Sequence, residues 1–169
     1  MRFISLFFTA LLFFVCLSCE SSRKDTEIID SFFKLRKEGA VDEAWPMTDA
    51  GTREKISFRL FERYCFKNKV IRYDIKKSED DFYVVTYSFY DKRFKKDGSE
   101  LHTFYINSIT EHIRVDRGKI IFPHPLFLKL REDIEADNLD SAKETINKML
   151  DISPGQKDVI STGKRLGLI

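Results

Sequence analysis

The feature that most limits what this 169-residue chain can fold into is an apolar run at its amino terminus. Residues 3–17 are apolar apart from Ser5 and Thr9, and Arg2 places a positive charge before them. The run is about fifteen residues long, which is typical of an export signal and shorter than the roughly twenty that cross a bilayer core. We therefore predict a signal peptide at residues 1–18. An uncleaved signal anchor is a less favoured interpretation.

The run ends in Cys16-Leu17-Ser18-Cys19, and residues 20–25 are polar. This pattern resembles a bacterial lipobox, in which a small residue precedes a cysteine that receives a lipid. Ser18 and Cys19 match the last two positions, whereas Cys16 and Leu17 depart from the strict pattern. The resemblance implies a fatty-acylated Cys19, a tether at residues 19–25 and a place in the bacterial cell envelope, in a membrane and leaflet left undetermined. An ordinary secretory signal with an incidental cysteine is the alternative.

Lipidation at Cys19 would hold the protein on a membrane through its acyl chains, because each buried methylene contributes about 0.8 kcal/mol. Cys16 would leave with the signal and Cys19 would be capped, so Cys65 would have no cysteine partner. The aromatic neighbours of Cys65 predict a buried, unreactive thiol. A reactive thiol or an intermolecular disulfide is the less favoured interpretation.

The residues after the tether begin with the periodicity of amphipathic helices. Asp25 is placed to cap the first helix, Gly39 to end it, and Pro46 to stop the second. The expected helices lie at residues 26–38, 40–45 and 49–66.

From residue 70 the pattern changes to β-branched and aromatic residues separated by turn signals. Asp97-Gly98 and Arg117-Gly118 suit tight hairpins, and short connections make neighbouring strands antiparallel. The expected strands are residues 70–77, 82–91, 100–115 and 119–122. After Pro123 and Pro125 helical patterns return, at residues 126–136, at 139–150 and from about Pro154. The predicted class is α+β: three N-terminal helices packed on a four-stranded antiparallel sheet, followed by a C-terminal helical hairpin.

The start of this domain resembles a known family. The run Ile28–Gly39 followed by Asp42–Trp45 is similar to the opening of NTF2-like domains, and most similar to their lipoprotein-associated DUF4878 branch. Element order matches over residues 25–123, and the motif matches over residues 26–45. The resemblance implies a curved sheet wrapped around the first helix as a cone, which some members use for ligands or catalysis and others fill. It transfers no catalytic residue to this chain.

The tail carries a second resemblance. Residues 137–154 are similar to the second helix of a tetratricopeptide repeat, with matching spacing at Ala142, Ile146, Met149 and Pro154. One repeat cannot build a superhelical groove by itself. We therefore expect a helix pair packed on the domain, with binding of a protein partner as the alternative. The expected organisation is a signal peptide at 1–18, a lipidated tether at 19–25, an NTF2-like domain at 26–123 and a helical segment at 124–169.

No motif indicates chemistry. His102 and His112 differ by ten residues, so on one strand they would lie over 30 Å apart at about 3.3 Å per residue. They could not share a metal ion, and we expect structural or surface roles for them and for His124. The sequence has no glycine-rich phosphate loop, serine elbow or zinc motif. We therefore predict no catalytic residue, no metal site and no cofactor.

Charge excludes one class of partner. The chain has 29 Lys and Arg against 27 Asp and Glu, so it is too nearly neutral to indicate nucleic-acid binding. Basic residues alternate with aromatics at Arg59, Arg63, Lys67, Lys69 and Arg72, and again at Lys92, Arg93, Lys95 and Lys96. A solvated face is the favoured interpretation, and contact with anionic lipid headgroups is the alternative.

These features together predict a membrane-tethered, non-enzymatic binding or scaffold domain of the cell envelope, with an unknown ligand. One alternative is a cavity enzyme or small-ligand carrier with an NTF2-like fold. Another is an envelope-assembly protein that binds a partner through its C-terminal helices.

Overall fold

The computed structural model describes residues 23–67, 69–78, 81–91 and 105–169. Several predicted features lie outside these ranges: the signal peptide, Cys19, His102, the basic residues at 92–96 and the expected hairpin at Asp97-Gly98. Within them the chain forms helices and one four-stranded antiparallel sheet in the order β1-β2-β3-β4. The predicted α+β class is confirmed at this level.

The strands follow the alternating segments of the sequence. They are β1 (Val70–Lys77), β2 (Tyr83–Asp91), β3 (Tyr105–Asp116) and β4 (Lys119–Ile121). Arg117 and Gly118, with φ of 48° and 74°, form the predicted turn between β3 and β4. Two consecutive positive φ values match the twist of the strands that such a turn joins, and glycine adopts them without steric cost.

The N-terminal helix occupies residues 23–38 of the described chain. Asp25 lies inside this helix, so its predicted role as the cap is wrong. Gly39 ends the helix as expected, with φ of 80°. The Ala40 amide then donates to the Leu35 carbonyl at 2.9 Å, which satisfies one of the last carbonyls of the helix.

The helix predicted at residues 49–66 is wrong as a single element. It is divided into α3 (Ala50–Lys55) and α4 (Phe58–Lys67). Ile56 between them is extended, with φ of −120° and ψ of 127°, and its side chain is buried. Ser57 Oγ accepts from the Leu60 amide at 3.2 Å and so starts a new helix, because it satisfies an otherwise unpaired amide.

Before α3 the chain forms α2 (Val41–Ala44) and a short 3₁₀ helix, η1 (Trp45–Met47). As predicted, the α-helix does not extend beyond Pro46. Pro46 itself lies in η1, the 3₁₀ helix that follows α2. The side chain of Asp49 accepts from the amides of Gly51 and Thr52 and caps α3.

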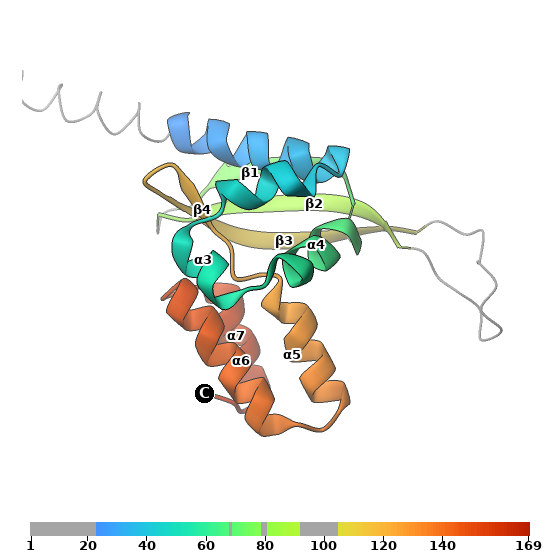
Figure 1. The fold of residues 1–169 in the computed structure, drawn as a ribbon, viewed down its shortest axis with the longest axis vertical. Coiled ribbons are helices and arrows are strands. Elements are labelled where there is room, and N and C mark those ends of the chain that lie inside the picture. The colour runs from blue at the N-terminus through green and yellow to red at the C-terminus, as the bar shows by residue number, and fades with distance from the viewer. Residues whose placement is uncertain (1–22, 68, 79–80, 92–104) are drawn as a thin grey trace, which may run out of the picture.

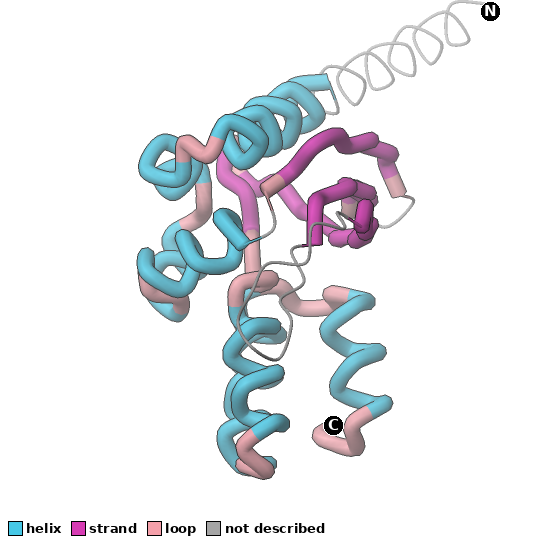
Figure 2. The backbone as a smooth tube through the Cα atoms, turned by 90° about the vertical axis from the view of Figure 1, so that its right-hand side faces the viewer, coloured by secondary structure: helices cyan, strands magenta, loops and turns pink. Residues whose placement is uncertain are grey.

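Helices surround the sheet on different sides. In Figure 1 the N-terminal helix runs along the top of the sheet, while α5 (Leu126–Glu135), α6 (Leu139–Ile152) and α7 (Lys157–Arg165) extend below it. Figure 2 shows the same helices from the side, below the curled strands. The Phe33 ring lies 5.3 Å from Tyr73 and 5.6 Å from Tyr87, so the N-terminal helix packs on β1 and β2.

The third helical segment expected from about Pro154 is α7, which contacts both α6 and β3, so three helices rather than a hairpin follow the sheet. Ala142, Ile146 and Met149, the positions that carry the repeat-like spacing, are fully buried. They belong to the same hydrophobic cluster as Phe32 and Phe33 of the N-terminal helix. The C-terminal helices therefore share one core with the sheet. Among the described residues, no helix is both long and apolar enough to cross a membrane.

Candidate functional site: a hollow between the sheet and the C-terminal helices

A hollow of about 440 Å³ opens where α4, β3, α5 and α7 meet. Part of its lining is apolar and consists of Phe89, Ile109, Phe127 and Leu128. Its remaining lining is polar or charged and consists of Tyr64, Lys67, Thr110, Glu111, His124, Arg131 and Asp158. A concave apolar site with a few convergent polar groups has the general composition of a small-molecule site.

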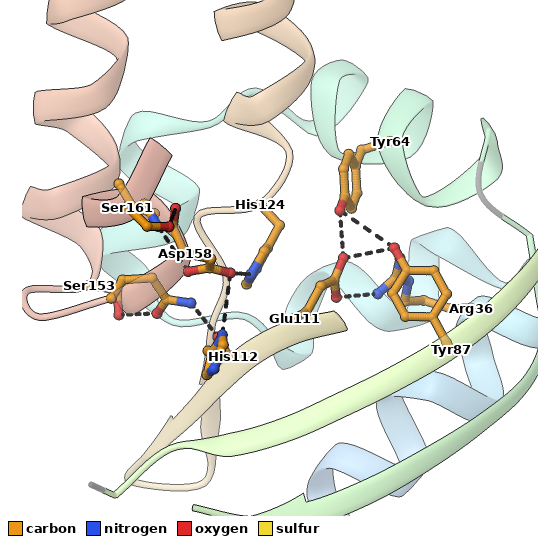
Figure 3. Close-up of polar contacts among 11 residues, drawn as sticks. Arg36, Tyr64, Tyr87, Glu111, His112, His124, Ser153, Asp158 and Ser161 are labelled. Carbon is orange, nitrogen blue, oxygen red and sulfur yellow. Dashed lines mark hydrogen bonds and ion pairs between the residues drawn. The ribbon is translucent and has the colours of Figure 1, made fainter. Parts of the chain in front are cut away.

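Glu111 is the central polar group beside this hollow, and Figure 3 shows three side chains directed at its carboxylate. Arg36 Nη1 donates to Glu111 Oε2 at 2.9 Å. The hydroxyls of Tyr64 and Tyr87 both donate to Oε1, the latter at 2.8 Å. Burial is the largest single influence and would raise the pKa of Glu111, but the Arg36 charge, the nearby His124 and the two hydroxyls together hold that pKa below its ordinary value. Glu111 is thus ionised, and its two oxygens already accept hydrogen bonds from side chains of the protein.

Arg36 lies within a cage of aromatic rings. Its guanidinium carbon is 4.7 Å from the Tyr87 ring centre and 4.8 Å from that of Phe33, and its side chain is fully buried. Among the described residues, Nε and Nη2 of Arg36 have no hydrogen-bond partner, and the ring faces supply the remaining attraction for the cation. Burial works against the charge, but the attraction of Glu111 raises the pKa of Arg36 above its ordinary value.

His124 and Asp158 form a second polar contact in the hollow. His124 Nε2 lies 3.1 Å from Asp158 Oδ2, and His112 Nδ1 lies 3.8 Å from the same oxygen (Figure 3). Burial raises the pKa of Asp158, but His124, Gln156 and His112 together outweigh burial and lower that pKa to about 2. The Nδ1 atom of His124 is buried and has no hydrogen-bond partner in the part of the chain that the structure describes.

The start of α7 holds Asp158 in this position. Asp158 Oδ1 accepts from the Val159 amide at 3.0 Å, within the first turn of the helix. A carboxylate is favoured there by the helix dipole. Just before this turn, the Gln156 side-chain amide donates to the His112 carbonyl, which ties α7 to β3.

Structural or surface roles were expected for His112 and His124, and Asp158 was not singled out in the sequence. In the structure, both imidazole rings lie beside the carboxylate of Asp158. His124 is buried, whereas about a quarter of the His112 side chain is exposed. Within the described residues, no cluster of three or more His, Cys, Asp and Glu side chains is arranged to hold a metal ion.

Sequence reasoning also missed the Arg36–Glu111 pair. Arg36 follows Ile29, Phe32 and Phe33 at the spacing of one helix face, so the periodicity that placed those three residues in the core also placed Arg36 there. Glu111 shares the strand face of the buried Ile113. The signal for this pair in the sequence was a charged residue at a position where the periodicity of the element predicts a buried apolar side chain.

Cys65 is buried, and the prediction of an apolar environment is confirmed. Burial raises the pKa of its thiol to about 12, so the thiol is protonated at neutral pH. Of the predicted basic positions, Arg59, Arg63 and Lys67 lie on α4 and are exposed. Lys69 and Arg72 are exposed near the start of the sheet.

The chain matches no protein-family model, no curated protein and no solved structure.

Proposed function

We propose that this protein is a lipid-anchored binding domain of the bacterial cell envelope, which takes a small and mainly apolar ligand into the hollow beside His124. The anchor rests on the lipobox-like sequence at Cys19, and the ligand site rests on the hollow. The proposal keeps an NTF2-like cone as the architecture, supported by the opening motif and by the N-terminal helix that lies on the sheet.

The observation that carries the ligand site is a partly apolar hollow beside His124, whose buried Nδ1 atom has no hydrogen-bond partner within the described residues. The carboxylate of Asp158 only accepts, so His124 Nε2 carries a proton. The Nδ1 atom is an acceptor when the ring is neutral and a donor when it is charged. A ligand hydroxyl, which can both donate and accept, would satisfy it. Phe89, Ile109 and Leu128 would contact the apolar part of the ligand.

A non-enzymatic role is supported by the state of Glu111. Its two oxygens accept from Arg36, Tyr64 and Tyr87, and its pKa is lowered, so it is a weak base with little free hydrogen-bonding capacity. Phe32 and Phe33 are fully buried and fill the space beneath the N-terminal helix. The interior is thus largely used for stability, and the hollow at its side is the part left for a ligand.

The ligand site is tested with 1-naphthol as a probe, because it has an apolar ring and one donating hydroxyl. Naphthol should bind more tightly than 1-methoxynaphthalene by about fivefold, the equivalent of one net hydrogen bond. Leu128→Trp should fill the hollow and reduce naphthol affinity at least tenfold. Leu139→Trp, at a position 57 % exposed on α6, is the matched control and should bind normally. Equal affinities for all three proteins would refute the site.

The anchor is tested separately by metabolic labelling with a fatty acid. Labelling of the native chain and its absence in Cys19→Ala would support lipidation. Equal labelling of both chains would exclude Cys19 as the acceptor.

A cavity enzyme is the second candidate, because Asp158 orients His124 as it would orient a general base. Small molecules that copurify with the native protein and with His124→Gln separate the two functions. A binding domain should carry the same compound in both proteins, in a smaller amount in the variant because His124 contacts the ligand. An enzyme should hold substrate in the variant and product in the native protein.

An assembly role through the C-terminal helices is the third candidate, favoured by exposed apolar side chains at Ile134, Leu139, Leu166 and Ile169. Deleting these helices would be uninformative, because Leu126 and Ile146 are part of the core. Crosslinking in the native membrane should instead compare the native chain with Leu139→Asp. A neighbour lost only from the variant would support this role.

A further inference from the structure

The most exposed large apolar side chain among the described residues belongs to Phe66, near the end of α4, with 67 % of its area exposed. Three cations, Arg59, Arg63 and Lys67, recur at four-residue intervals on the same helix. With Phe66 and Glu62 they line a shallow hollow of about 510 Å³. We call these five residues the α4 patch.

The patch has an excess of positive charge. Arg63 is paired with Glu132 of α5. Within the described residues, Arg59 and Lys67 make no ion pair, and Glu62 is the only carboxylate of the patch. An exposed ring flanked by unpaired cations combines an apolar group that can enter a membrane interface with charges that attract anionic headgroups.

The position of the patch relative to Cys19 fits a surface that faces the membrane. Cys19 precedes the first described residue by four positions, a reach of at most about 14 Å. The helix of residues 23–38 is then about 24 Å long. At its far end, a Cβ added at Gly39 would lie 4.0 Å from the ring of Phe66. A bilayer lying along this helix would thus meet the anchor at one end and the α4 patch at the other.

The outward face of the same helix is compatible with such a bilayer. It exposes four cations, Arg23, Lys24, Lys34 and Lys37, of which Arg23 pairs with Glu27 and Lys34 with Asp30. This face is therefore polar and of mixed charge, and the excess of positive charge lies on the α4 patch.

We propose that the α4 patch docks on anionic phospholipid headgroups of the membrane to which the chain is tethered, with the Phe66 ring in the interface. The proposal rests on the lipid anchor proposed above and adds an orientation to it. It also places the hollow beside His124 near the membrane surface, because Lys67 lines both the hollow and the patch.

The test uses the full lipidated chain reconstituted in vesicles, with Phe66→Trp as a fluorescent reporter. The single native tryptophan, Trp45, packs against Phe58 and Phe61 and is replaced by Trp45→Phe so that the emission reports one site. One set of vesicles is pure phosphatidylcholine, and the other contains one third phosphatidylglycerol. Brominated acyl chains serve as quenchers. Docking predicts a blue-shifted emission and at least twofold stronger quenching in the anionic vesicles.

Charge variants identify the source of the attraction. In the reporter background, Arg59→Glu together with Lys67→Glu should remove most of the additional quenching. The matched control, Lys143→Glu with Lys164→Glu, makes the same change of charge on exposed positions of α6 and α7 and should leave the quenching unchanged.

The outcomes separate this proposal from the anchor. Failure of the native chain to sediment with vesicles would refute the anchor itself. Sedimentation with no quenching, or with equal quenching in both lipids, would overturn docking and leave the anchor intact. A dimer in detergent that Phe66→Ser dissociates, without any dependence on lipid composition, would assign the patch to a second copy of the chain and overturn the proposal as well.

Discussion

Arg36 Nη1 lies 2.9 Å from Glu111 Oε2, although the two residues are 75 positions apart and both side chains are almost completely buried. The pair joins the N-terminal helix to β3 beneath the hollow. Tyr64 and Tyr87 complete the coordination of the carboxylate, so two helices and two strands converge on it. A buried ion pair of this kind stabilises a fold only while both partners are present.

Glu111→Gln should destabilise the protein by about 3–5 kcal/mol, because it leaves the Arg36 charge buried without its counter-ion. Urea denaturation followed by circular dichroism measures the change. Glu135→Gln removes an exposed carboxylate that pairs with Arg131, and this control should change stability by less than about 0.5 kcal/mol. Similar losses of stability in Glu111→Gln and Glu135→Gln would mean that the burial of the ion pair is not the cause.

Asp158→Asn should cost stability in a pH-dependent way. The folded pKa of Asp158 is about 2, below its ordinary value of 3.8, so the carboxylate stabilises the fold above about pH 4. That contribution is lost as the pH falls through 2. The variant should therefore be less stable by about 2 kcal/mol at pH 6 and nearly equal to the native protein at pH 2.

Asp151→Asn is the matched control for that titration, because Asp151 is 62 % exposed and pairs with Lys55 on the surface. Its denaturation midpoint should follow that of the native protein at both pH values. If the difference in stability between Asp158→Asn and the native protein stayed constant from pH 6 to pH 2, this would contradict the lowered pKa of Asp158.

The Cys65 thiol should resist alkylation in the folded protein, because burial raises its pKa to about 12. Iodoacetamide treatment at pH 8 followed by peptide mass mapping isolates this site from the other cysteines. Phe66→Cys provides an exposed thiol at the next position and should be modified at least a hundredfold faster. Comparable rates at the two sites would show that Cys65 is accessible.

Asn138→Ala should destabilise the fold by about 1 kcal/mol, because the Asn138 side chain accepts from the Ser141 amide and caps α6. Thermal unfolding gives the change. Asn147→Ala replaces an exposed residue in the middle of the same helix, where alanine has the higher helix propensity, and should be neutral or slightly stabilising.

Local patterns predicted most of the secondary structure because they depend on neighbouring residues. The four strands were expected within a few residues of their observed bounds, except that the predicted start of the third strand at residue 100 lies outside the described residues. The division between α3 and α4 was missed because the apolar spacing continues across Ile56, which is extended and buried in the hydrophobic core. Asp25 was misassigned as a cap because a good capping residue also tolerates the first turns of a longer helix.

The candidate site could not be predicted in the same way. His124 and Asp158 are 34 positions apart, and no spacing rule links a residue after β4 to the first turn of α7. Arg36 was visible on an apolar face, but its partner was not, because the sequence does not show which strand passes beneath a helix.

The amino-acid sequence by itself determined the order of helices and strands, the turn at Arg117-Gly118 and the isolation of Cys65 from other thiols in the described domain, since periodicity and turn preferences act over a few residues. Only the tertiary structure decided that Glu111 is neutralised by Arg36, that Asp158 gathers two histidines and that Phe66 lies exposed among cations. These properties depend on burial and on distances between segments far apart in the chain, which exist only once the core has formed.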